Sequence, residues 1–138
     1  MIQCYNTHMK LFRPVGLKEL ELIIASGYKT FPPRLPEQPI FYPVMNYEYA
    51  EQITREWNVP SPPYAGFVTS FDMDDTYISK FPIKTVGGKI HQELWVPAEE
   101  LDEFNGHIIG KIEVLSAFYG DQFSEPVSSE TNLPIRLS

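Results

Sequence analysis

The sequence is poor in the residues from which disulfides and metal sites are built. Its 138 residues include one cysteine, Cys4, and only three histidines, at positions 8, 91 and 107. A single thiol cannot close a disulfide within the chain, and the histidines are too far apart for an H-x-x-x-H motif. We therefore expect neither a disulfide framework nor a metal site.

Long apolar runs are also missing. No stretch approaches the ~18 apolar residues that a membrane-spanning helix needs. The first residues, MIQCYNTHMKLF, contain neither the apolar stretch nor the small-residue cleavage site of a signal peptide. The sequence therefore predicts a cytoplasmic protein that does not enter a membrane.

Positive charge is scarce. The chain has 11 Lys and Arg residues against 18 Asp and Glu, which gives a net charge of −7. Such a chain lacks the electrostatic attraction on which nucleic-acid and anionic-membrane binding depend. One or two arginines can still hold a small anionic ligand locally, so a nucleotide is compatible with this composition.

Several common active-site motifs do not occur. The Gly87-Gly88-Lys89 turn has no upstream glycine at the spacing of a phosphate-binding loop, and Ser70 is not in a G-x-S-x-G motif. The pair Asp74-Asp75 lacks a calcium-loop pattern and is better explained as a helix cap.

Proline and tyrosine are abundant, with 13 and 8 residues. This composition favours short elements joined by fixed loops. The segment YKTFPPRLPEQP (28–39) contains four prolines, so we expect an ordered loop that lies over another part of the molecule.

Residue patterns predict a single α+β domain over 10–120, between a leader of uncertain order (1–9) and a poorly ordered tail (121–138). Connections between several strands are too short for parallel crossovers, so we expect short, mostly antiparallel sheets with two or three helices. The expected strands are 10–15, 40–44, 64–73, 82–86, 90–96 and 108–119, and the main helices are 17–26, 47–57, capped by Asn46, and 97–105.

Glu93 is the most unusual residue of the predicted strand 90–96. Because side chains alternate between the faces of a strand, His91, Glu93 and Trp95 share one face. A glutamate inside a strand is either a solvated charge at a sheet edge or a functional group. Both interpretations remain open at this point.

Arg13 and Tyr42 are further candidates. Arg13 lies in an apolar strand, where its charge is costly unless it forms a salt bridge or faces a cleft. Tyr42 ends a short strand directly before a capped helix, and it either packs in the core or forms the floor of a pocket.

Three runs of the sequence resemble a family of short bacterial proteins labelled "ADP-ribosylation/crystallin J1". The runs are LFRPVGLKELELIIASGYKTFPPRLPEQPIFYPVMNYEYAEQITREW, GFVTSF and TVGGKIHQELWVPAEELDEFNGHIIGKIEV, and the resemblance covers roughly residues 10–119. The hydrolases that share this label are larger, helical, dimetal proteins, and the chain has neither their length nor their acidic metal motifs.

The order of the candidate residues also resembles the ADP-ribosyltransferase fold, which has a split sheet. This resemblance implies that Arg13, Tyr42 and Glu93 form a nicotinamide pocket, with NAD bound as substrate. Glu93 would stabilise charge on the ribose, and Tyr42 would stack on nicotinamide. Arg13, helped by Arg34, would pair with the phosphates, and His91 would orient the ribose or the acceptor.

The resulting hypothesis is an NAD-binding, ADP-ribosyltransferase-like protein that transfers ADP-ribose to an unidentified acceptor, for which a protein is one candidate. The alternative is a non-catalytic module that binds a protein or a small molecule. Under the alternative, Glu93 would be exposed or paired with a lysine such as Lys84 or Lys89. The hypothesis requires Arg13, Tyr42 and Glu93 to converge on one cleft.

Overall fold

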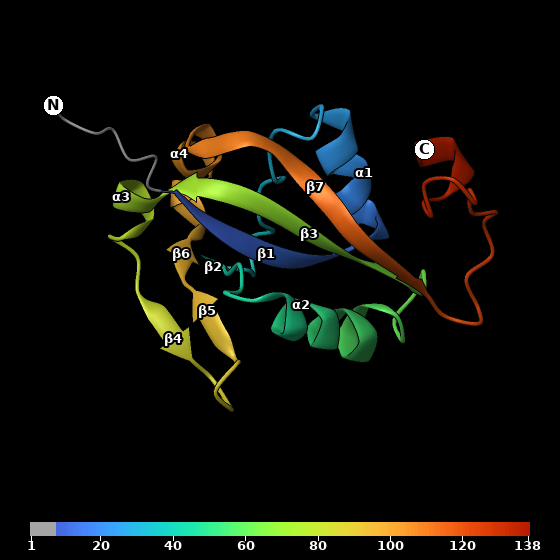
Figure 1. Cartoon of the computed structure of the whole chain (residues 1–138), viewed down its shortest axis with the longest axis horizontal. Coiled ribbons are helices and arrows are strands. Elements are labelled where there is room, and N and C mark those ends of the chain that lie inside the picture. The colour runs from blue at the N-terminus through green and yellow to red at the C-terminus, as the bar shows by residue number, and fades with distance from the viewer. Residues whose placement is uncertain (1–7) are drawn as a thin grey trace, which may run out of the picture.

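A computed structural model describes residues 8–138. Its central element is a three-stranded antiparallel sheet in the order β1-β3-β7, formed by β1 (His8–Gly16), β3 (Ala65–Asp74) and β7 (Ile108–Tyr119) (Figure 1). Seven successive residues of β3 are buried, because this strand lies between the other two and is covered on both faces.

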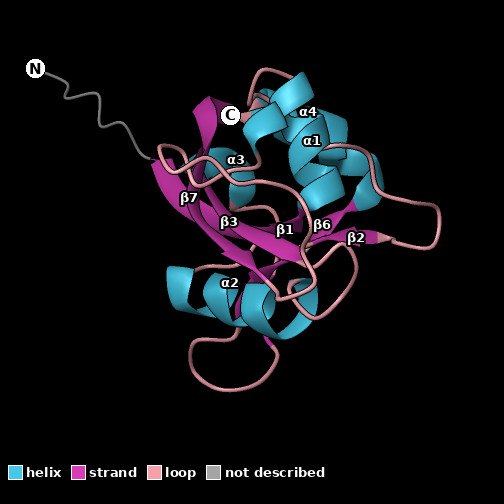
Figure 2. Ribbon diagram, turned by 90° about the vertical axis from the view of Figure 1, so that its right-hand side faces the viewer, coloured by secondary structure: helices cyan, strands magenta, loops and turns pink. Residues whose placement is uncertain are grey.

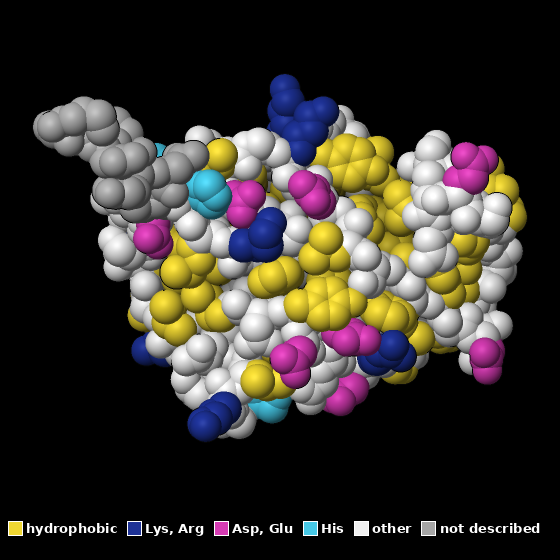
Figure 3. All heavy atoms as spheres, viewed as in Figure 1, with side chains coloured by type: hydrophobic (Ala, Val, Ile, Leu, Met, Phe, Trp, Pro, Cys, Tyr) yellow, Lys and Arg dark blue, Asp and Glu magenta, His cyan; other side chains and the backbone are white. Residues whose placement is uncertain are grey.

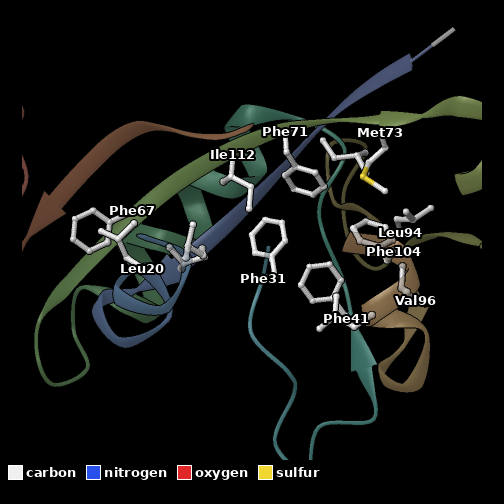
Figure 4. Packing of buried hydrophobic residues seen from close by; sticks show 14 of the residues in the cluster. Leu20, Phe31, Phe41, Phe67, Phe71, Met73, Leu94, Val96, Phe104 and Ile112 are labelled. Atoms are coloured by element: carbon white, nitrogen blue, oxygen red, sulfur yellow. The ribbon is translucent and has the colours of Figure 1, made fainter. Parts of the chain in front are cut away.

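Helices cover both faces of this sheet. Figure 2 shows α2 (Tyr47–Ile53) on one face and α1 (Leu17–Ala25) with α4 (Leu101–Gly106) on the other. The larger core lies on the α1 side, where phenylalanine rings contact each other edge to face (Figure 4). Its central aromatic residues are Phe31, Phe41, Phe71 and Phe104.

Two small antiparallel pairs complete the sheets. The strand β2 (Ile40–Phe41) pairs with β6 (Val96–Pro97), and β4 (Ile83–Thr85) pairs with β5 (Gln92–Leu94). Val44 forms bridges to both Phe12 and Glu93, and this connects β5 to the central sheet. The expected α+β class with short antiparallel sheets is confirmed. Residues 8–138 contain four α-helices where two or three were expected, because the one-turn helix α3 (Asp75–Ile78) adds to the three longer ones.

The helix expected over 47–57 changes its geometry part of the way along. Its start is as predicted, because the Asn46 side chain accepts a hydrogen bond from the Tyr49 amide at 2.8 Å. After Ile53 the chain forms a π-helical turn, Thr54–Asn58, which the Val59 amide closes by donating to the Thr54 carbonyl. The helical period places Trp57 on one face with Tyr49 or Ala50 and Ile53, and its side chain is 70% exposed in this turn.

The C-terminal segment is the one for which the sequence predicts a poorly ordered tail (121–138). It forms a bridge between Val127 and Pro134, and Leu133 is buried in the larger core. The Arg136 guanidinium pairs with Glu125 and with Glu21 of α1, beside which Figure 1 places this end of the chain. A few anchoring contacts hold a segment that has no periodic pattern.

The N-terminal leader was expected to extend to residue 9, but β1 already begins at His8. The rest of the leader, including Cys4, lies outside the described residues. Within residues 8–138, no helix combines the length and apolar character required of a membrane span.

Candidate functional site

A pocket of about 500 Å³ lies between the C-terminal end of β1, the first turn of α1, the proline-rich loop 28–39, α2 with its π-helical turn, and β5. Its volume is typical of small-ligand sites. The expectation that the proline-rich loop lies over another part of the molecule agrees with this position. The lining residues are Arg13, Pro14, Gly16, Glu19, Arg34, Gln38, Tyr42, Tyr49, Ile53, Trp57, Asn58 and Glu93.

Four of the five candidate residues selected from the sequence meet in this pocket. Arg13, Arg34, Tyr42 and Glu93 all contribute to its lining, although they come from segments up to 80 positions apart. His91 is not part of the lining. The structure therefore brings the required residues to one cleft, and their functional roles remain predictions.

Glu93 is buried, with 8% of its surface exposed. Its Oε2 accepts a hydrogen bond from the Tyr49 hydroxyl, and its Oε1 accepts one from Trp95 Nε1 at 3.0 Å. Among the described residues it forms no ion pair, so its interpretation as a solvated or lysine-paired charge is wrong. A carboxylate has about four acceptor positions, and two bonds leave capacity for a ligand.

For Tyr49 the helical period of 47–57 indicates only that Tyr49 or Ala50 shares one face of the helix with Ile53 and Trp57. Burial, and then the hydrogen bond to Glu93, raise the pKa of the Tyr49 hydroxyl above its usual range. The hydroxyl therefore remains a protonated donor at neutral pH. No local signal identifies this role, because the two partners are 44 residues apart in the chain.

His91 contacts the ring of Tyr49 and does not line the pocket itself, and the two ring centroids are 4.8 Å apart. Its Nδ1 accepts a hydrogen bond from the Gly88 amide at 2.8 Å, so the ring hydrogen lies on Nε2 and is donated to Gln52 Oε1 at 3.0 Å. Gly87 must remain small, because a Cβ there would lie 2.4 Å from Nδ1.

Arg13 satisfies both conditions that its position requires, since it forms a salt bridge and also lines the pocket. Its guanidinium is 6% exposed and binds Glu19 through two bonds, Nε to Oε2 at 2.7 Å and Nη2 to Oε1 at 3.0 Å. It also lies over the Phe41 ring, 4.6 Å from the centroid. The two bonds to Glu19 leave part of its five N–H donors free for a ligand.

Arg34 is the second cation of the pocket. Its Nε donates to the Ile40 carbonyl at 3.1 Å, and among the described residues its guanidinium forms no ion pair. Burial, and next the neighbouring Arg13 cation, lower the pKa of Arg34. Two cations this close repel each other, so a bound anion would stabilise both.

Tyr42 is 41% exposed, so its interpretation as a plain core residue is wrong. Its ring centroid is 5.8 Å from the Arg34 guanidinium carbon. Tyr42 lines the same pocket as Tyr49 and Glu93, so its exposed ring is in contact with Arg34 and open to the pocket.

The pair formed by Arg13 and Glu19 leads to a stability prediction. Arg13→Met is expected to lower the free energy of unfolding by about 2 kcal/mol, because it leaves a half-buried Glu19 without its partner. In the double variant Arg13→Met/Glu19→Leu, most of this loss should be recovered. Urea unfolding of the single and double variants measures the coupling. If the loss of unfolding free energy in the double variant equalled the sum of the losses in Arg13→Met and Glu19→Leu, the pair would contribute nothing to stability.

Residues 8–138 contain no cluster of three or more His, Cys, Asp or Glu side chains placed to hold a metal ion. What the pocket offers is a fixed carboxylate, two guanidinium groups and exposed aromatic rings. No family model, curated protein or solved structure matches this chain.

Proposed function

We propose that this pocket binds NAD and that the protein transfers ADP-ribose from NAD to an acceptor. The observation that carries the proposal is the meeting of a buried, doubly hydrogen-bonded carboxylate with an arginine pair in one pocket. Arg13 and Glu19 neutralise each other in their salt bridge, so among the described lining residues Arg34 and Glu93 are the cation and the anion that form no ion pair. NAD has the matching arrangement, with a cationic nicotinamide ring and an anionic pyrophosphate.

The chemistry assigned to Glu93 is electrostatic. When the bond between ribose C1′ and the nicotinamide nitrogen breaks, its electron pair goes to the nitrogen and neutralises the ring. Positive charge then develops on the ribose, as in glycoside hydrolysis, and a fixed carboxylate stabilises it. The acceptor nucleophile forms the new bond to C1′ and gives up a proton.

The remaining residues of the proposal bind and position. Tyr42 offers an exposed ring face for stacking on nicotinamide. Arg34, assisted by Arg13, pairs with the pyrophosphate. Tyr49 and Trp95 hold the two oxygens of Glu93, and His91 acts through its contact with the Tyr49 ring, so we propose it as a positioning residue.

A second candidate function is a non-catalytic binding module with the same pocket. One observation favours it: Glu19 already occupies the bidentate edge of Arg13, which leaves Arg34 as the less restrained cation for a phosphate. Such a module would bind a nucleotide or another small anion without cleaving it.

The proposal is tested by incubating the purified protein with NAD and measuring nicotinamide release by chromatography, in parallel with the thermal unfolding midpoint in NAD and in ADP-ribose. We expect nicotinamide release, and a rise in the midpoint with both ligands, because a ligand that binds only the folded state stabilises it. A midpoint shift without release would support the binding module. If nicotinamide were not released and the midpoint did not rise with either ligand, both functions would be contradicted.

A further inference from the structure

The indole of Trp57 is 70% exposed and lines the pocket. Burial of a large apolar side chain is favourable, so an exposed indole in a pocket is available to a ligand. Trp57 lies in the π-helical turn Thr54–Asn58, and it lines the pocket together with Tyr49 and Ile53 of α2.

The strand opposite this turn is adapted to it. Gly66 of β3 packs so closely that a Cβ there would lie 2.6 Å from Thr54 Cγ2 and 2.7 Å from Asn58 Cβ. The turn also buries Thr54, whose hydroxyl donates to the Ala50 carbonyl. π-Helical turns are rare and are frequent at functional sites. The position of Trp57 is therefore built into the packing of the sheet and is not the result of a frayed helix end.

Glu93 and Trp57 both line the pocket, and they come from different elements. Val44 connects Phe12 to Glu93, and Gly16, four positions further along β1, lies beside the side-chain amide of Asn58. Tyr49, whose hydroxyl donates to Glu93, is followed eight positions later by Trp57 along α2 and its π-helical turn.

We infer that Trp57 is the platform on which the base of a nucleotide stacks, and that the ligand is a nucleotide whose phosphates connect this base to a sugar at Glu93. Arg13 and Arg34, which can pair with phosphates, line the same pocket as Glu93 and Trp57. Stacking on an exposed indole is a common way for proteins to hold a base. The placement of the sugar at Glu93 depends on the proposed function, whereas stacking of the base on Trp57 does not require that the ligand be cleaved.

The surface beside the pocket favours a short ligand over a nucleic-acid chain. Glu48, Glu51 and Glu56 lie together on α2 and its π-helical turn, and Arg55 beside them is paired with Glu51, which leaves this group with a net negative charge. Figure 3 shows acidic side chains gathered over this helix. A polynucleotide crossing Trp57 would have its backbone repelled there, whereas a dinucleotide within the pocket would not.

The test compares two ligands by calorimetry. ADP-ribose has a base and a terminal sugar, and ribose 5-phosphate has no base. We expect Trp57→Leu to weaken ADP-ribose binding tenfold or more, and Trp57→Phe to weaken it less, because phenylalanine keeps a ring face. Binding of ribose 5-phosphate should be the same in all three proteins. Because Trp57 is exposed, these variants are expected to fold normally, and the thermal unfolding midpoint verifies this.

Two outcomes would overturn the inference: equal affinity of the wild-type and Trp57→Leu proteins for ADP-ribose, or equal weakening of ribose 5-phosphate. If the wild type releases nicotinamide but Trp57→Leu binds ADP-ribose normally, the proposed activity stands and the base platform fails. If no nicotinamide is released but ADP-ribose binding depends on Trp57, the platform stands and the proposed cleavage fails.

Discussion

Replacement of Glu93 by glutamine is expected to lower the rate of nicotinamide release about 100-fold or more. The reason is that the amide has nearly the same shape as the carboxylate but no charge to stabilise the developing positive charge on the ribose. Chromatographic measurement of kcat and KM in the variant and the wild type tests this expectation. The loss should be in kcat, because the charge on the ribose develops only in the transition state.

The local geometry allows this variant to fold. Trp95 Nε1 can only donate, so the amide oxygen must face it, and the amide nitrogen then faces the Tyr49 hydroxyl, which can rotate to accept. Glu103→Gln, an exposed change on α4, is the matched control and should leave kcat unchanged. If Glu93→Gln folded normally and retained wild-type kcat, Glu93 would have no part in the chemistry.

Replacement of Gly66 by alanine is expected to lower the free energy of unfolding by about 3 kcal/mol. This is the upper end of the range of losses typical when atoms are added to a well-packed core. The added Cβ meets Thr54 Cγ2 and Asn58 Cβ at distances that no unstrained contact has. The Asn58 atom is fixed to its helical backbone, so the π-helical turn must move away from β3. Urea unfolding measures the loss of stability. Calorimetry measures the affinity for ADP-ribose, which should fall if Trp57 is displaced.

Gly106→Ala is the control for this change, because a Cβ at Gly106 would meet nothing within 4 Å. Its free energy of unfolding should stay within about 0.5 kcal/mol of the wild type. Adding Thr54→Ser to Gly66→Ala removes one of the two clashing atoms and keeps the hydroxyl bond to Ala50, so part of the stability should return. Equal stability of Gly66→Ala and Gly106→Ala would show that the turn is not held by this close approach.

The parts of the fold that could be predicted are those determined by local chemistry. Asn46 begins its helix because its side chain caps the amide of Tyr49, and Asp74 caps α3 in the same way. Alternation along the strand placed Glu93 beside Trp95, and the structure joins them by a hydrogen bond. The convergence of Arg13, Tyr42 and Glu93 was expected from a family resemblance and not from any local pattern.

The remaining features depend on contacts between distant segments. The period of an α-helix placed Trp57 on one face with Tyr49 or Ala50 and Ile53, but nothing in residues 54–58 signals a π-helical turn. The partner of this turn, Gly66, comes eight positions later. The burial of Glu93 depends on Tyr49, and Leu133 of the C-terminal segment reaches the core. Each of these is a tertiary contact that overrides a local preference.

The two hydrogen bonds of His91 limit where a proton can go during the proposed reaction. With its Nδ1 engaged by the Gly88 amide and its Nε2 hydrogen engaged by Gln52, the imidazole has no free lone pair at which to act as a base. Glu93 retains unused acceptor positions on the pocket side. One carboxylate would then serve twice, first as the counter-charge for the sugar and afterwards as the receiver of the proton that the attacking nucleophile gives up.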